Sequence, residues 1–137
     1  MNRRSLREQV FKLLFRVEFN SKEEMEEQCH LFLEHEDIEI SEKDADHIIG
    51  KFTAVHDKVE EIDTLINEKA KGWSTERMGK VDLTIIRLAV YEMKYDAEVP
   101  EGVAINEAVE LAKKFGQDES AGFVNGVLAK FVENKKS

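Results

Sequence analysis

The chain has 137 residues, a single cysteine and a formal net charge of -9 at pH 7. This length suits one compact domain that can bury a hydrophobic core without disulfides or structural metal ions. A single cysteine excludes an internal disulfide. No apolar run approaches the ~18 residues of a membrane span, and the start does not read as a secretory signal, so we expect a cytoplasmic protein with no membrane partner.

The charge is distributed unevenly along the chain. Residues 1–20 carry five basic and two acidic residues, residues 21–66 carry four and fifteen, and residues 67–137 carry eleven and twelve. A chain this acidic repels polyanions at long range, so nucleic-acid binding would need a local basic patch and would weaken with salt. We interpret the acid-rich block as the solvated face of a surface helix and its loop; it comprises Glu23, Glu24, Glu26, Glu27, Glu34, Glu36, Asp37 and Glu39.

Apolar residues in the first half of the chain recur at helical spacing. Ser21 followed by Glu24 has the form of a capping box, which marks the start of a helix. Ser41 with Asp44 opens the next helical pattern in the same way. The predicted helices cover residues 3–19, about 21–35 and 41–71, the last as one long, bent helix or as two abutting helices.

The second half of the chain continues the helical pattern. Gly72 and Trp73 stop the preceding helix, and Ser74 can cap a short turn. Asp82 starts a strongly apolar helix. Pro100 ends the loop that connects this helix to the next one. Further helices are predicted over residues 103–115, with Gly116 as the C-terminal stop, and from about residue 120. Because no alternating strand pattern or hairpin turn occurs, we expect an all-α fold of about seven helices.

The sequence offers little support for catalysis. The histidines His30, His35, His47 and His56 are not at ligand spacing with one another, and Cys29 has no CxxC partner. The chain also lacks a nucleophile elbow, a Walker loop and a GxGxxG motif. We therefore expect no metal, no cofactor and no enzymatic activity.

The basic start of the chain is the strongest candidate for a binding site. Arg3, Arg4 and Arg7 lie in the first turns of a helix, where cations are unfavourable at the positive end of the helix dipole. Arginine matches phosphate in a two-point geometry, which points to an anionic partner. The alternative is a charged terminus that only solubilises a fraying helix.

Other residues extend this candidate site along the same helix. Lys12 and Arg16 continue the polar side. Phe15 lies next to that side, where an exposed ring could stack on an unpaired base, although the same spacing also suits a core residue. In the last predicted helix, Gly122 and Gly126 each cost ~1 kcal/mol relative to alanine, which close helix packing or close approach of a ligand would explain.

Motifs in the second half of the chain resemble the NusB family of bacterial transcription antitermination factors. The resemblance covers the chain from the arginine-rich start to the last helix, but residues 21–60 carry little that is diagnostic. The residues that carry it are Trp73, Arg77, Val81-Asp82, Ile86-Arg87-Leu88-Ala89, Tyr91-Glu92, Pro100, VAINEAVELAKKFG at 103–116 and FVNGVL at 123–128.

The resemblance implies a non-catalytic protein of two packed small helical bundles, here about residues 1–72 and 73–137. Members of the family bind the single-stranded boxA RNA of ribosomal RNA operon transcripts. They do so with NusE, a small-subunit ribosomal protein, inside an RNA polymerase elongation complex with other Nus factors that resists termination. The free protein is a monomer or a homodimer in such a family.

The resemblance also assigns roles to individual residues. The RNA-binding residues it implies are Arg3, Arg4, Arg7 and Phe15 at the start, and Glu119, Ser120 and Phe123 as a second RNA-contacting edge. The family often has tyrosine at the position of Phe15, and phenylalanine can stack but cannot donate a hydroxyl hydrogen bond. Asp82 corresponds to part of the surface that meets NusE, or is simply an N-cap.

Three other classes of protein compete with this interpretation. The same fold resembles the amino-terminal RNA-binding region of a ribosomal RNA cytosine methyltransferase, but 137 residues leave no room for a cofactor-binding α/β domain. A helical adaptor could use the arginines to bind an acidic protein. A helix-turn-helix DNA binder fits less well, because the basic charge sits at one helix start and not along a recognition helix.

Overall fold

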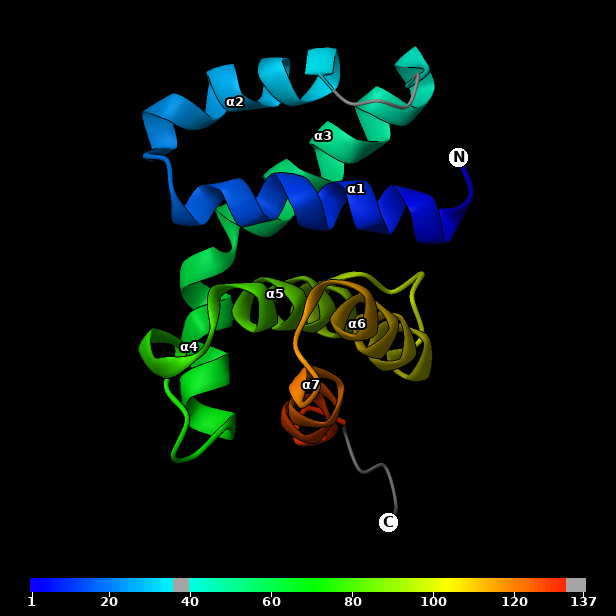
Figure 1. The fold of residues 1–137 in the computed structure, drawn as a ribbon. Helices are drawn as coiled ribbons and strands as arrows, with labels where there is room; N and C mark the ends of the chain where they lie inside the picture. The colour runs from blue at the N-terminus through cyan, green and yellow to red at the C-terminus, as the bar shows by residue number, and fades with distance from the viewer. Residues whose placement is uncertain (36–39, 133–137) are drawn as a thin grey trace. The chain divides into compact units, whose positions relative to one another are not determined.

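The computed structural model describes residues 1–35 and 40–132, and Glu36, Asp37 and Glu39 of the acid-rich block lie outside these residues. The described residues form seven α-helices, two short 3-10 helices and no strand, which confirms the all-α prediction (Figure 1). The elements are α1 (Arg3–Phe15), η1 (Arg16–Glu18), α2 (Lys22–His35), α3 (Glu42–Asp57), α4 (Val59–Lys69), η2 (Thr75–Arg77), α5 (Lys80–Tyr95), α6 (Glu101–Phe115) and α7 (Ser120–Ala129).

The chain divides into two compact units, which we call unit 1 (Met1–Asp57) and unit 2 (Lys58–Ser137). The division follows Asp57, because α4 packs on α5 and so belongs to unit 2. The apolar stripe over residues 41–71 is two abutting helices, because Lys58, with φ -103° and ψ 5°, interrupts the helical backbone between α3 and α4.

Unit 1 is built around the contact between α1 and α3, which cross in Figure 1. The buried face of α1 carries apolar side chains at helical spacing, as the sequence predicted. Met25 and Phe32 are the most deeply buried apolar residues of α2. The α1 and α3 side chains that complete the core are Val10, Phe11, Leu13, Leu14, Ile48, Phe52 and Val55.

The helix starts of unit 1 follow the predicted capping chemistry. The Ser21 N–H donates to Glu24 Oε1 at 2.7 Å and the Glu24 N–H donates to Ser21 Oγ at 3.2 Å, which confirms the capping box. These hydrogen bonds hold the pKa of Glu24 below its usual value. Ser41 Oγ accepts the Asp44 N–H at 3.1 Å at the start of α3.

The first helix is shorter than predicted. It ends at Phe15, and the chain tightens into the 3-10 turn η1 instead of continuing to Phe19. The carbonyl of Arg16 accepts both the Phe19 N–H at 3.1 Å and the Asn20 side-chain amide at 2.8 Å. These two local bonds replace the α-helical pattern at that point.

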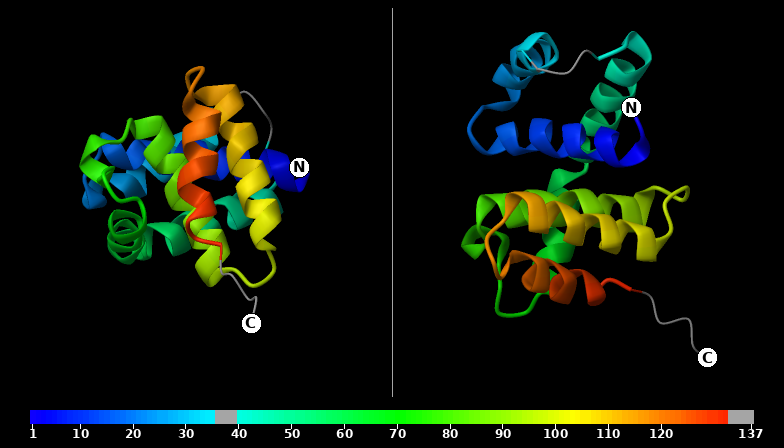
Figure 2. Two further views of the ribbon diagram at one scale, coloured as in Figure 1. Left: turned by 90° about the horizontal axis from the view of Figure 1, so that it is seen from below. Right: turned by 45° about the vertical axis from the view of Figure 1, so that its right-hand side comes forward.

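Unit 2 is centred on α5, which packs against α4, α6 and α7. The left view of Figure 2 shows α6 and α7 side by side. The helix α5 is strongly apolar, as predicted, and is buried on nearly all sides. The buried side chains from α6, α7 and the residues after α7 include Ala104, Ala108, Leu111, Ala112, Val124, Val127, Leu128 and Phe131.

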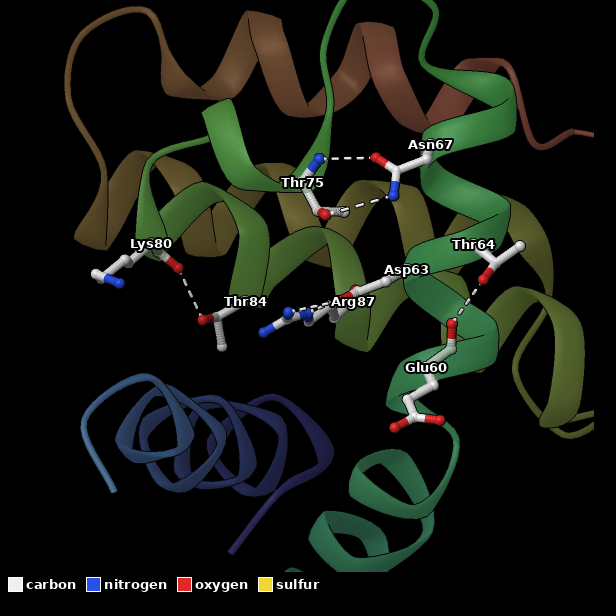
Figure 3. Close-up of polar contacts among 8 residues, drawn as sticks. All are labelled: Glu60, Asp63, Thr64, Asn67, Thr75, Lys80, Thr84 and Arg87. Atoms are coloured by element: carbon white, nitrogen blue, oxygen red, sulfur yellow. Dashed lines mark hydrogen bonds and ion pairs between the residues drawn. The ribbon is translucent and has the colours of Figure 1, made fainter. Parts of the chain in front are cut away.

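Polar contacts fix α4 and the following turn within unit 2 (Figure 3). Arg87 of α5 forms a bidentate ion pair with Asp63 of α4, at 2.8 Å from Nε and 2.7 Å from Nη2. The Asn67 side-chain oxygen accepts the Thr75 N–H at 2.8 Å, which holds η2 against α4. In the part of the chain that the structure describes, no helix is both long and apolar enough to cross a membrane.

Candidate nucleic-acid interface

The start of α1 presents exposed arginines in a helical turn that contains no acidic residue. Asn2 is the N-cap, and its Oδ1 accepts the Ser5 N–H at 2.8 Å. Arg3 and Arg4 follow as exposed residues of the first turn, which contains no acidic residue. Their guanidinium groups therefore lie at the positive end of the helix dipole. An anion that binds there is attracted both by the guanidinium charges and by the dipole.

The N-terminal end of α1 is also tied to α3. The ammonium group of Met1 lies 3.0 Å from Asp44 Oδ2. This ammonium group holds the pKa of the Asp44 carboxyl below its usual value, first through its hydrogen bond. The tie limits fraying of the first turn, so Arg3 and Arg4 are presented from an ordered backbone.

The three remaining cations of α1 and η1 differ in their surroundings. Arg7 is half-buried one helical turn after Arg3. Lys12 lies 3.9 Å from Glu8 on the same helix. Arg16 is turned onto α2, where its Nη1 donates to Gln28 Oε1 at 3.1 Å and its guanidinium lies 5.1 Å from the centre of the Phe32 ring. Arg16 is therefore a residue that fixes the α1–α2 connection, and the exposed cations concentrate at the helix start.

Phe15 belongs to a row of aromatic rings at the end of α1. It is half-buried, with its ring centre 6.3 Å from that of Phe11 and 5.2 Å from that of Phe19. Phe11 is core and Phe19 is 61% exposed, so Phe15 lies between core and solvent. The sequence did not indicate Phe19 as a candidate site residue. The available signal was its position at the end of the aromatic row, where the apolar pattern stops.

The turn before α7 holds the next predicted residues, Glu119 and Ser120. Glu119 is exposed and makes no side-chain capping bond. Ser120 is 3% exposed, and its Oγ accepts the Gln117 N–H at 2.9 Å. A Cβ on Gly116 would lie 2.5 Å from Ser120 Cβ, so the close turn needs glycine there. The hydroxyl of Ser120 shapes this turn and faces the protein.

Phe123 lies in an aromatic cluster that the sequence did not reveal. Its ring centre lies 5.3 Å from that of Trp73 in an edge-to-face arrangement, and Trp73 is 50% exposed. The guanidinium of Arg77 lies 5.9 Å from the centre of the Trp73 ring. Trp73 and Arg77 are therefore candidate binding residues, and the position of the chain's one tryptophan just after the helix-stopping Gly72 was the available signal.

Gly122 and Gly126 flank Phe123 on the exposed side of α7. Nothing lies within 4 Å of a Cβ built on either glycine. Packing within the chain therefore does not explain them. Of the two explanations that the sequence offered, close approach of a ligand is the one that the open space favours.

Asp82 is the third residue of α5, and Gly79 is the N-cap of this helix. The alternative in which Asp82 is only an N-cap is therefore wrong, because the helix begins two residues earlier than predicted. Asp82 is half-buried in the first turn, where a carboxylate is favourable at the positive end of the helix. Among the described residues, no group of three His, Cys, Asp or Glu side chains could hold a metal ion.

These features define an all-helical protein in which unit 1 carries a cationic helix start and unit 2 carries a half-exposed aromatic cluster. Such residue types bind phosphates and unpaired bases. Comparison with known proteins gives the family. The chain matches the model of the NusB family over residues 4–133 and belongs to that family.

The curated relatives cover the whole chain. Transcription antitermination protein NusB of Agathobacter rectalis is 55% identical over 96% of this chain and 100% of its own length. The protein of the same name from Lachnoclostridium phytofermentans is 47% identical over 97% of this chain and 100% of its own length. These matches therefore span residues 21–60 as well, where the motifs alone were not diagnostic.

Solved structures agree with the fold. NusB from T. maritima is 33% identical, with a TM-score of 0.82 over 95% of this chain and 89% of its own. A chain in a crystal structure of the antitermination factors NusB and NusE in complex with dsRNA is 25% identical, with a TM-score of 0.80 over 93% of this chain and 92% of its own.

Proposed function

We propose that this chain is a transcription antitermination factor that binds single-stranded boxA RNA of ribosomal RNA operon transcripts together with NusE. The relatives carry the name transcription antitermination protein. The observation on this chain that carries the proposal is the exposed pair Arg3 and Arg4 in a first turn without an acidic residue. We also infer that it acts in the cytoplasm, where transcription takes place in bacteria.

The proposed contacts divide by chemistry. Arg3, Arg4 and Arg7 bind phosphates and set the position of the RNA backbone, because phosphate contacts carry little sequence information. Phe15 and Phe123 stack on unpaired bases, and Trp73 extends the aromatic surface beside Phe123. Glu119, being exposed, accepts hydrogen bonds from base amino groups.

The partner surface is proposed on α5. Asp82 contacts NusE, and NusE links the bound RNA to the RNA polymerase elongation complex. Replacing Asp82 by alanine is expected to weaken NusE binding and leave the binding of RNA alone within about twofold, because no phosphate contact is removed. Titration of labelled NusE, with and without RNA, measures both quantities.

The first experiment is fluorescence anisotropy of a labelled single-stranded boxA RNA, with a scrambled RNA and a duplex of the same length as comparisons. Binding that favours boxA and strengthens with NusE supports the proposal. If about four phosphates are neutralised, log affinity falls against log salt with a slope of about -3. Equal, weak binding of all three RNAs with no effect of NusE would contradict it.

Variants test the arginines themselves. The triple change Arg3→Ala, Arg4→Ala and Arg7→Ala is expected to weaken boxA binding by at least about tenfold and to leave Tm nearly unchanged, since these side chains lie outside the apolar core. A matched control removes three exposed lysines on other helices, Lys22, Lys69 and Lys113. A similar loss in the control would show that net charge, and not the helix start, governs binding.

A further inference from the structure

Unit 1 contains an apolar groove that the proposed RNA site does not use. The groove lies between α2 and α3 and encloses about 320 Å³. This volume falls at the lower end of the ~300–1,000 Å³ that is typical of ligand sites. The lining residues are Met25, Glu26, Cys29, His30 and Leu33 of α2 and Ile49, Phe52 and Thr53 of α3.

The floor and the walls of the groove differ in exposure. Met25 and Phe52 are buried at 3% and 4% and form the floor. Leu33 and Ile49 are half-buried, so part of each apolar side chain faces solvent. The side chains recur at three- and four-residue spacing on both helices, which leaves an elongated apolar strip between them.

The groove is surrounded by negative charge. The helix α2 carries five glutamates and one lysine, and α3 carries four acidic residues and two lysines. Glu26 itself lines the groove and is exposed. Asp46 and Asp57 are exposed on α3, each within about one turn of a lining residue. A partner that covers this strip therefore gains from positive charge beside its apolar side chains.

Gly50 supplies an independent indication of a partner. It is an exposed glycine in the middle of α3, next to the lining residue Ile49 and one turn before Thr53. Nothing lies within 4 Å of a Cβ built there, so packing inside the chain does not require glycine. A glycine at such a position weakens the helix and lets another backbone approach closely.

We propose that the α2–α3 groove binds a basic amphipathic helix of a partner protein. An amphipathic helix lays its apolar face into such a strip through side chains at i, i+3, i+4 and i+7, and its flanking lysines or arginines face the acidic residues. Glu26 of the acid-rich block is then part of a binding surface and not only of a solvated face. The proposal stands on unit 1 alone and does not depend on RNA binding.

The test uses the full chain and a synthetic helical peptide with leucine at i, i+3, i+4 and i+7 and lysine on its other faces. A peptide of the same composition with these residues scrambled is the control. We expect the patterned peptide to bind at least about tenfold more tightly by fluorescence anisotropy, because only it can bury a continuous apolar face. Equal binding of the two peptides would overturn the proposal.

Two variants locate the binding. Glu26→Lys is expected to weaken the patterned peptide by about fivefold, the effect of one rim charge. Glu27→Lys makes the same charge change on the same helix at an exposed residue outside the groove lining, and is expected to have less than about half that effect in free energy. Equal losses would show that only long-range charge attracts the peptide.

Gly50→Gln separates binding from stability. Glutamine favours a helix more than glycine does, so Tm is expected to stay the same or rise. Its side chain obstructs the approach at this point, so affinity for the patterned peptide is expected to fall several-fold. Unchanged affinity would contradict the part of the proposal that places the partner's backbone beside Gly50.

Cys29 provides a direct readout of the groove, because it is the chain's one cysteine and lines the groove. Bound peptide is expected to slow its alkylation by a maleimide, and the scrambled peptide is not. Absence of protection would place the peptide elsewhere. Dimerisation of the chain in sedimentation, abolished by Glu26→Lys and without any binding of the patterned peptide, would show that a second copy occupies the groove.

Discussion

Unit 1 and unit 2 use similar helices but pack them differently. In unit 2, α6 packs along both α5 and α7, and α5 is buried on nearly all sides. In unit 1, α1 and α3 form the core, whereas α2 and α3 leave an apolar groove between them. The difference shows that the well-packed unit carries the specific sequence motifs, while the more open unit carries most of the unbalanced charge, both basic and acidic.

The largest expected effect comes from truncating the core of unit 2. Ile86 is fully buried, so Ile86→Ala should lower the free energy of unfolding by about 3–4 kcal/mol through lost burial and a cavity. Leu33→Ala in the groove wall of unit 1 should cost only about 1 kcal/mol, because this side chain is already half-exposed. Urea unfolding measures both values. Equal losses would contradict the difference in packing.

The ion pair between α4 and α5 gives the next effect. Arg87→Ala should cost about 2 kcal/mol, because it removes two charge-assisted hydrogen bonds and leaves Asp63 only 25% exposed without its partner. The control is Lys113→Ala, which breaks the exposed pair with Glu110 and should cost less than about 0.5 kcal/mol. A small loss for Arg87→Ala would mean that α4 is not held to unit 2 by this pair.

Glycines in unit 2 should respond in opposite directions. Gly116→Ala should destabilise by about 1–3 kcal/mol, since the new methyl group would lie 2.5 Å from Ser120 Cβ and 2.8 Å from the Ala112 carbonyl oxygen. Gly122→Ala should stabilise by about 0.5–1 kcal/mol, because its Cβ meets open space. Thermal unfolding distinguishes these signs. A loss of RNA affinity in Gly122→Ala would add evidence that the exposed glycines serve a ligand.

The smallest effect is expected at the tie between α1 and α3. The pKa of Asp44 is lowered in the folded chain by the Met1 ammonium, so this carboxylate stabilises the fold at pH values above its unfolded pKa. The contribution is lost as the pH falls through the lower, folded pKa. Asp44→Asn should therefore lower Tm at pH 7, and the difference from the parent chain should vanish in acid. A difference that persists in acid would have another cause.

The sequence determined most of the secondary structure. Capping residues fixed the starts of α2 and α3, because each acts on backbone groups within four residues of itself. The helix α6 ends before Gly116 as predicted, although this glycine is extended, with φ -92° and ψ -169°. The strongly apolar sequence of α5 agrees with its burial on nearly all sides. The family motifs likewise depend on local sequence alone, so the family could be inferred before the structure.

Tertiary structure decided which residues of each helix are available for binding. Periodicity could not tell whether Phe15 is core or exposed, and contacts with Phe11 and the solvent-facing Phe19 place it between the two. The side chain of Arg16 is hydrogen-bonded to Gln28 of α2, and the hydroxyl of Ser120 accepts a hydrogen bond from Gln117 within its own turn. Spacing gives the face of a helix on which a residue lies, but only packing against other elements determines whether that face is covered.

The boundary between the units and the aromatic cluster also required the folded chain. One apolar stripe runs through α3 and α4, so the break at Lys58 and the grouping of α4 with α5 depend on contacts such as Asp63 with Arg87. Trp73 and Phe123 are fifty positions apart in the sequence and meet only when α7 folds back. Local propensity acts over a few residues, whereas these contacts join segments that only chain topology brings together.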